Sequence, residues 1–411
     1  MTPASSLLLV LPLGVHLKEG RVFIERQAAN GVKRWLANFS RMTLAVKVLP
    51  GEPSADEVEI DPRKLGDALT VELMPSGWTP YEHYSERSGM QRRLKAWIDN
   101  HDYLQFAIGG TWGDWAAMGA MIAAKKGRKA SIWMDRVESE VLRLSALRDK
   151  GLRRVRGLFY SKISGFRERQ VIRASTLGLF HGNDTLSTLG AFSPNPYLVH
   201  NIHLSKADRI SPDRLEAKVT AAGGGPLELV YLGRIHPDKG VMDWIETLKL
   251  LSMRHIPFRA RWFGDGPDME EARAKVERLG LSQSVSFPGR LESRDEILET
   301  LRSAHMMLFC HMTPESPRCL IEALMSGTPI VGYGSAYSED LIADHAGGIL
   351  TEMDATKLAD AVAQLHFDRA GLARLIRNAA KDGHDMNDEA VFAHRSELMK
   401  RFTAPQPQMA I

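Results

Sequence analysis

The 411-residue sequence has little cysteine, no long apolar run and almost no net charge. Its two cysteines, Cys310 and Cys319, are too few for a disulfide framework and favour a reducing compartment. No run of 18 or more apolar residues occurs, so the sequence predicts no membrane-spanning helix. The net charge of +3 gives no indication of a nucleic-acid partner, and we expect none.

The apolar run 7–13 near the start has no basic residues before it and is followed by Gly14. We interpret it as a first buried strand and not as a signal peptide. These features together predict a cytosolic protein, or a peripheral one at the inner face of the cell membrane.

What is present indicates two domains, because 411 residues with 44% apolar content can form two separate cores. Apolar runs alternate with helical patterns in both halves, which is typical of parallel sheets with crossover helices. The polar stretch 205–225 ends in three glycines and is expected to contain the interdomain linker. We place the domains at 1–204 and 205–385, followed by a crossing helix and frayed tail at 386–411.

The expected elements are short and follow one plan in each half. The first half predicts strands at 7–13, 44–49, 103–108, 130–134 and 176–180. The second half predicts strands at 227–232, 259–263, 285–287, 306–309 and 329–332, with helices at 237–253, 268–279, 294–304, 317–326 and 355–365. The fold class is therefore α/β, with two Rossmann-like doubly wound domains that face a cleft at the carboxyl ends of their strands.

The segment 313–329 is the most informative part of the chain, with the sequence TPESPRCLIEALMSGTP. Ser316 suits a helix N-cap and Pro317 the first helical position, while Gly327 suits a left-handed stop. The free N–H groups at such a helix start favour an anion. Glu315 would lie at that helix start and Glu322 about two turns further on. This arrangement suits a sugar phosphate.

This segment resembles the paired-glutamate signature of retaining GT-B glycosyltransferases of the GT4-like, or group 1, type. Three further motifs occur in the order found in that family: LVYLGRIHPDKG at 229–240, WFGDGP at 262–267 and VSFPG at 285–289. Four ordered motifs make a specific signal over about 227–365, whereas the first half resembles the family only in its pattern of elements. The resemblance implies the GT-B fold, with the C-terminal helix crossing back to the first domain.

The resemblance also implies roles for individual residues at the donor site. Arg234 and Lys239, near Gly233, would stabilise the leaving diphosphate, and Glu322 would accept the ribose hydroxyls. Glu315 would contact the sugar and assist at the reacting face, so the expected catalytic residues are Glu315, Arg234 and Lys239. The base would lie against 285–290, which ends in Arg290.

The sequence departs from the family pattern in this same segment. Six residues separate Glu315 from Glu322 where the family has seven, and Ser316 replaces the usual glycine. Arg318 is unusual in the first turn of a helix, so it either points to solvent or meets the donor phosphate or an acidic sugar. The donor-binding set is expected to be Gly233, Arg234, Lys239, Arg290, Glu315, Ser316, Arg318 and Glu322.

A metal ion is not expected, because the sequence contains no Asp-x-Asp triplet, the usual indication of a metal-bridged diphosphate. We also expect no cofactor, since the nucleotide sugar is a substrate. Acceptor-side candidates in the first domain are Asp135, Gly110 within 109–111, and His181 at the start of 181–184. For each of them, an ordinary turn or cap role is an equally good interpretation.

The segment 148–173 contains nine Lys or Arg residues and two acids, with a stripe of apolar residues at helical spacing. The stripe comprises Leu152, Val155, Phe159, Ile163 and Phe166. A basic amphipathic helix of this kind can lie on an anionic membrane, or it can pack on its own domain with a solvated basic face. The sequence leaves both interpretations open.

The favoured function is a retaining hexosyltransferase that uses a UDP- or GDP-sugar and a glycan or lipid-linked acceptor. The resemblance associates it with bacterial surface polysaccharide biosynthesis. One alternative is a nucleotide-sugar 2-epimerase of GT-B shape. Another is a noncatalytic nucleotide-sugar-binding partner subunit, for which the altered glutamate spacing is the only indication.

Overall fold

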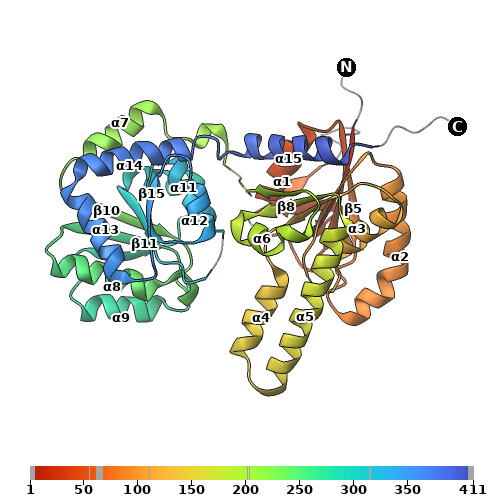
Figure 1. The fold of residues 1–411 in the computed structure, drawn as a ribbon, viewed down its shortest axis with the longest axis horizontal. Helices are drawn as coiled ribbons and strands as arrows, with labels where there is room; N and C mark the ends of the chain where they lie inside the picture. The colour runs from red at the N-terminus through yellow and green to blue at the C-terminus, as the bar shows by residue number, and fades with distance from the viewer. Residues whose placement is uncertain are drawn as a thin grey trace. The chain divides into compact units, whose positions relative to one another are not determined.

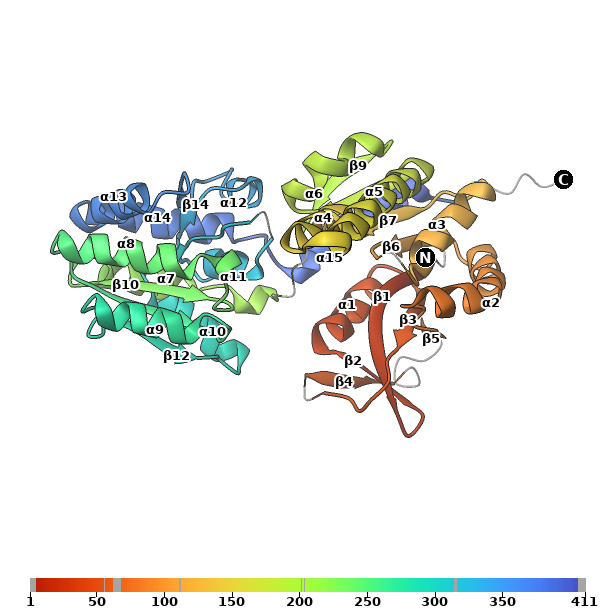
Figure 2. The same ribbon diagram turned by 90° about the horizontal axis from the view of Figure 1, so that it is seen from below.

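The computed structural model describes residues 5–54, 56–61, 68–110, 112–200, 202, 204–313 and 316–405. The chain divides into two compact units. Unit 1 comprises Met1–His203 and Asp388–Ile411, and unit 2 comprises Leu204–Asn387. Each unit has its own sheet with helices packed against both faces, as Figures 1 and 2 show.

The sheet of unit 1 has a parallel part in the order β5–β3–β1–β6–β7–β8–β9. The strands β2 and β4 extend it in antiparallel fashion from the far end of the long strand β1. The strand bounds are β1 Ser6–Lys18, β2 Arg21–Glu25, β3 Arg41–Val48, β4 Glu57–Ile60, β5 Leu69–Met74, β6 Tyr103–Ala107, β7 Ser131–Met134, β8 Leu177–His181 and β9 Pro196–Val199.

Helices cover unit 1 in two layers. One apolar cluster joins the sheet to α1 and α15, and a second joins it to α2, α3 and the last turns of α5. The helix bounds are α1 Arg26–Leu36, α2 Pro80–Asp99, α3 Trp115–Lys125, α4 Glu138–Arg148, α5 Gly151–Ala174, α6 Gly182–Leu189 and α15 Asp388–Thr403. Within the described ranges, no helix combines the length and apolar character needed to cross a membrane.

The sheet of unit 2 is parallel, with the order β12–β11–β10–β13–β14–β15. Its strands are β10 Leu227–Leu232, β11 Phe258–Phe263, β12 Val285–Gly289, β13 Met306–Phe309, β14 Ile330–Tyr333 and β15 Gly348–Thr351. Its helices are α7 Pro212–Ala221, α8 Val241–Met253, α9 Met269–Arg278, α10 Arg294–Ser303, α11 Arg318–Met325, α12 Ala336–Leu341, α13 Ala355–Phe367 and α14 Arg369–Asp382.

Both sheets confirm the predicted fold class, but two local expectations were wrong and one helix begins later than predicted. The stretch 205–225 contains helix α7, capped by Ser211, and is therefore not simply a linker. Helix α11 begins at Arg318 after Pro317 in the N-cap position, so Ser316 lies outside the helix and does not cap it. The helix expected at 148–173 is α5, which begins at Gly151 and ends at Ala174, while α4 ends at Arg148.

The predicted C-terminal helix is confirmed as α15, which packs on α1 and the sheet of unit 1. Its Arg395 is buried, donates a hydrogen bond to the carbonyl of His200 and lies 4.7 Å from the ring centroid of Trp133. Burial lowers the pKa of Arg395 to about 10, and the carboxylate of Asp135 opposes that shift. A cation buried in this way anchors the last helix to the rest of unit 1.

Close backbone approach at glycines joins the loops at the carboxyl end of the unit 2 sheet. A Cβ atom on Gly240, which has φ +68°, would lie 1.9 Å from the carbonyl oxygen of Cys310. A Cβ atom on Gly264 would lie at the same distance from the carbonyl oxygen of Gly233. Only glycine permits these contacts, so the loops after β10, β11 and β13 form one packed layer.

We predict that Gly240→Ala is much more destabilising than Gly280→Ala. Both residues have positive φ, but a Cβ atom on Gly280 would meet no atom within 4 Å. The control should cost about 1 kcal/mol for the left-handed conformation. Gly240→Ala should cost on the order of 3 kcal/mol or more, because backbone must also move. Urea unfolding of both variants measures the difference, and equal costs would contradict the packed layer.

Candidate active site

The strand order of unit 2 places a topological switch point between β10 and β13. The chain runs from β10 through β11 to β12 on one side, and from β13 through β14 to β15 on the other. Loops that leave adjacent strands in opposite directions open a crevice at the carboxyl end of the sheet, where ligands of such folds bind. The predicted donor residues in 233–239 follow β10, and those in 316–322 follow β13.

The turn Gly233–Gly240 is held in place by backbone hydrogen bonds to its neighbours. The N–H of Ile235 donates to the carbonyl of Asp265 at 3.0 Å, and the N–H of Met312 donates to the carbonyl of Asp238 at 2.9 Å. These bonds bring together the motifs 229–240 and 262–267 that the sequence identified separately. They leave Arg234 exposed, whereas Lys239 is 9% exposed. The turn thus presents one solvated and one buried cation.

His311 is a member of this site that the sequence analysis missed. It lies two residues after the end of β13, is buried, and its Nε2 lies 2.6 Å from the hydroxyl of Tyr231 on β10. Burial lowers the pKa of His311 to about 3, and the positive charge of Lys239 acts in the same direction. The imidazole is therefore neutral at physiological pH and can exchange a hydrogen bond without adding charge.

Glu322 lies on α11, whose buried face packs in unit 2. Burial raises the pKa of Glu322, while the cations Arg318 and Arg294 oppose the shift. Arg318 is exposed and lies one turn before Glu322 on the same helix. Ser316 is half-buried just before the helix, and Glu315 lies outside the described residues. The structure thus combines Glu322 with local positive charge.

Arg290 is exposed and follows β12, on the other side of the switch point from α11. The preceding Gly289 has φ +95°, and its carbonyl accepts the N–H of Gly264 at 2.9 Å. The segment expected to contact the base is therefore attached to the same layer of loops that holds the Arg234 turn.

The acceptor-side candidates of unit 1 all follow parallel strands at one edge of the sheet. Gly110, with φ +109°, follows β6 and lines a pocket of about 20 Å³. Asp135 follows β7, is exposed and acts electrostatically on Arg395. His181 ends β8, is buried and lies against the ring of His200. The structure does not place Asp135 or His181 among the residues that line the Gly110 pocket.

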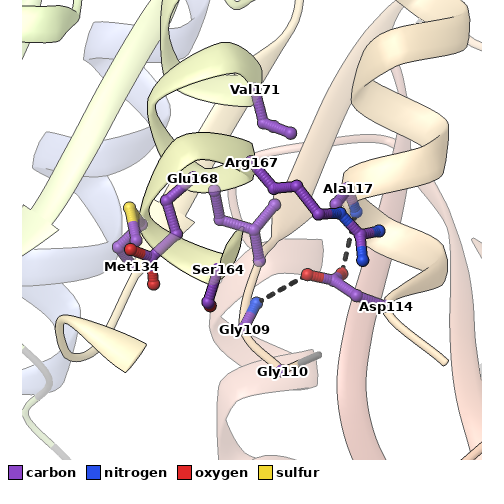
Figure 3. A pocket seen from close by; sticks show the side chains of 10 residues that line it. Gly109, Gly110, Asp114, Ala117, Met134, Ser164, Arg167, Glu168 and Val171 are labelled. Carbon is purple, nitrogen blue, oxygen red and sulfur yellow. Dashed lines mark hydrogen bonds between the residues drawn. The ribbon is translucent and has the colours of Figure 1, made fainter. Parts of the chain in front are cut away.

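Figure 3 shows the charged groups around that pocket, which the sequence analysis missed. Asp114 is buried and accepts hydrogen bonds from the N–H of Gly109 at 3.1 Å and of Ala117 at 2.9 Å. Burial raises its pKa to about 6, against the effect of these hydrogen bonds and of the cations Lys47 and Arg167. Lys47 is 4% exposed, and its ammonium group makes no hydrogen bond to another described residue.

Aromatic side chains lie beside these charges. His83 stacks on Trp115 at 5.0 Å and accepts a hydrogen bond from the N–H of Gly113. The His83 ring also makes edge-to-face contacts with Tyr84 and Trp112, with centroid distances of 5.5 and 5.8 Å. Tyr84 is exposed, as are Trp78 and Tyr81 in the same part of the chain. Arg167 and Lys47 both lower the pKa of His83, after the larger effect of burial, so the charged and aromatic groups are neighbours.

We predict that His305 and His311 remain neutral down to pH 5. Burial lowers the pKa of His305 to about 4, and its Nδ1 accepts the N–H of Glu228. Imidazole nitrogen spectra between pH 7.5 and pH 5 follow each ring. A midpoint near 6.5 for either buried ring would contradict the prediction.

The same shifts fix the sign of the pH dependence of stability. The unfolded chain takes up protons on both rings below pH 6.5, whereas the folded chain does so only near 4 and 3. The two histidines therefore contribute fully to the free energy of unfolding above pH 6.5. This contribution is lost as the pH falls towards their folded-state pKa values, at about 1 kcal/mol per pH unit for each ring.

Within the described residues, no cluster of His, Cys, Asp and Glu side chains could hold a metal ion. The arrangement in unit 2 is instead one of cations, a neutral histidine and a glutamate around the carboxyl ends of β10 and β13.

Comparison with known proteins shows which family the second half of the chain resembles. Residues 213–382 match the family model described as glycosyl transferases group 1. WcaL of Escherichia coli K12, which is named as a colanic acid biosynthesis glycosyltransferase, is 29% identical over 201 residues. The match covers 47% of this chain and 48% of WcaL, so the chain spans about half the length of the curated relatives it matches.

Solved structures show the same fold over nearly the whole chain. HepE of Anabaena in complex with UDP has a TM-score of 0.62 at 14% identity, covering 95% of this chain and 98% of that one. Sucrose-phosphate synthase of Thermosynechococcus elongatus has a TM-score of 0.65 at 14% identity, covering 97% and 98%. Residues 213–382 thus resemble the group 1 glycosyl transferases, and the chain has the GT-B fold.

Proposed function

We propose that the protein is a retaining glycosyltransferase that moves a hexose from a UDP- or GDP-sugar to a glycan or lipid-linked acceptor. The observation that supports the proposal is the layer of loops that holds the turn with Arg234 and Lys239 after β10, with Glu322 on the helix that follows β13, in the segment matching the family. HepE, which has the same fold, has been solved with UDP and with UDP-glucose.

The chemistry requires stabilisation of two charges. When the bond from C1 of the sugar to the diphosphate breaks, positive charge develops on the sugar ring and negative charge on the leaving group. In our proposal Arg234 and Lys239 hold the diphosphate, and Glu322 accepts the ribose hydroxyls. Glu315, which lies outside the described residues, would contact the sugar.

Neutral His311 adds a polar group without repelling the cations that hold the donor. A protonated imidazole next to Lys239 would be unfavourable, which agrees with the direction of its pKa shift. We propose that it donates or accepts a hydrogen bond at the donor while Tyr231 fixes the orientation of its ring.

The acceptor would be bound by unit 1. The exposed rings of Trp78, Tyr81 and Tyr84 suit the C–H faces of sugar rings, and Lys47 and Arg167 suit an acidic or phosphorylated group nearby. Asp135, Gly110 and His181 remain further candidates on this side. The name of WcaL supports a place in surface polysaccharide biosynthesis. We further propose that the protein works at the inner face of the cell membrane, attached through the region 148–173.

The proposal is tested first by ligand binding. UDP, GDP, ADP and TDP are compared by thermal shift, and the nucleotide that stabilises the protein is then supplied as its labelled sugar donor. The proposal expects one of UDP and GDP to bind, followed by hydrolysis or transfer of the sugar with retention at C1. Absence of stabilisation by every nucleotide would contradict it, and inversion at C1 would exclude the retaining mechanism.

We predict that Lys239→Ala lowers turnover by about 10² or more, the usual effect of removing one charge-stabilising group from an active site. The matched control is Lys249→Ala on α8, which removes a partly exposed lysine that pairs with Glu246. Both variants should melt at similar temperatures. Turnover of Lys239→Ala within threefold of the parent would remove Lys239 from the site.

We predict that activity persists in excess EDTA, since two cations stand where a metal ion would otherwise hold the diphosphate. Initial rates with and without the chelator measure this directly. Complete loss of activity that Mg²⁺ or Mn²⁺ restores would show that the diphosphate is bound through a metal.

A further inference from the structure

Helices α4 and α5 form a hairpin that extends away from the sheet of unit 1 (Figure 1). Only the last part of α5 enters the core, through Val171 and Ile172. The outer part, from Gly151 to Phe166, packs mainly against α4. The hairpin thus presents an outer face whose purpose the fold of unit 1 does not explain.

Small residues of α5 form the seam with α4. A Cβ atom on Gly157 would lie 2.6 Å from the Cβ of Ala146, and a Cβ atom on Gly165 would lie 3.3 Å from that of Ser139. Between them, the hydroxyl of Ser161 donates to the carbonyl of Ser139 at 2.8 Å. The two glycines therefore permit close helix packing, which explains their presence inside a long helix.

The apolar stripe of α5 lies on the opposite face from this seam. At 3.6 residues per turn, Leu152, Phe159 and Phe166 are about half a turn away from Gly157 and Ser161. Leu152 is 87% exposed, Phe159 62% and Phe166 60%. Val155 and Ile163, between them, are exposed as well. The helix therefore packs on unit 1 through its other face and leaves the stripe exposed.

Positive charge accompanies the stripe. Arg153, Arg154, Arg156 and Lys162 are exposed, and none of the four forms an ion pair with another described residue. Arg169, further along, is instead placed over the ring of Phe192 in unit 1. An exposed apolar stripe among unpaired cations is the surface that an interfacial helix presents to anionic lipid.

We propose that the outer face of α5, from Leu152 to Phe166, binds the surface of a bilayer that contains anionic phospholipid. Phe159 and Phe166 enter the boundary between headgroups and acyl chains, and the four cations pair with lipid phosphates. Each cation near such a surface raises the partition constant about fivefold. A second copy of the chain fits this face less well, since a twofold contact would place the same cations against one another. The inference rests on this surface and not on the proposed transfer reaction.

The test uses the full chain and vesicles of phosphatidylcholine, alone or with phosphatidylglycerol, without a sugar donor. The parent should float with the anionic vesicles in low salt, bind far less in high salt and leave the neutral vesicles unbound. Two variants remove the apolar and the charged contributions to binding separately. Phe159→Ser with Phe166→Ser removes the inserted rings, and Arg153→Gln with Arg154→Gln and Arg156→Gln removes three of the cations. Each should reduce the partition constant at least tenfold.

Matched controls show whether an effect on vesicle binding is specific to the hairpin or follows from any loss of exposed apolar or charged side chains. Phe367→Ser with Met253→Ser removes exposed apolar side chains from unit 2, and Arg92→Gln with Lys95→Gln and Lys129→Gln removes three exposed cations elsewhere in unit 1. Both controls should bind vesicles like the parent, and all variants should melt like it. The proposal is overturned if the parent ignores anionic vesicles, if the controls lose binding equally, or if the hairpin variants instead abolish a dimer seen by light scattering.

Discussion

The contact of Gly240 with the carbonyl of Cys310 is the constraint on which the donor side of the molecule depends. It fixes the end of the turn that carries Lys239 against the strand that leads to His311. The corresponding contact of Gly264 with Gly233 fixes the beginning of the same turn. Backbone contacts then hold the turn that carries the two cations, and within it the Nδ1 of His236 accepts the N–H of Asp238. Preorganisation of this kind is what electrostatic stabilisation of a leaving group requires.

The sequence predicted the parts of the fold that carry strong local signals. Continuous apolar runs such as Leu227–Leu232 and Met306–Phe309 are buried parallel strands, and their bounds were found almost without error. Weaker elements were missed: β4 is a short strand of alternating glutamates and apolar residues, and α7 was hidden in a run of polar residues and glycines. Its cap, Ser211 before Pro212, was an available signal.

The candidate site of unit 2 could be predicted because its motifs lie within about 100 residues and keep their order. The charged group in unit 1 could not, since Lys47, Asp114 and Arg167 are far apart in sequence and meet only through the topology of the sheet. The hairpin was an intermediate case. Helical spacing revealed the apolar stripe, but which face packs inward depended on the small residues at Gly157 and Ser161, whose meaning appears only when α4 is in place.

The path of the chain through α15 has a consequence for synthesis. Unit 1 is built from two separated stretches of sequence, and its last helix contributes Phe392, Leu398 and Met399 to an apolar cluster with Trp35. While the ribosome is still producing residues before 388, that cluster lacks its cover and Trp133 lacks the guanidinium of Arg395. A nascent chain therefore cannot complete unit 1 in order of synthesis, although unit 2 can fold earlier. A chain that stops before α15 would leave this apolar face of unit 1 uncovered.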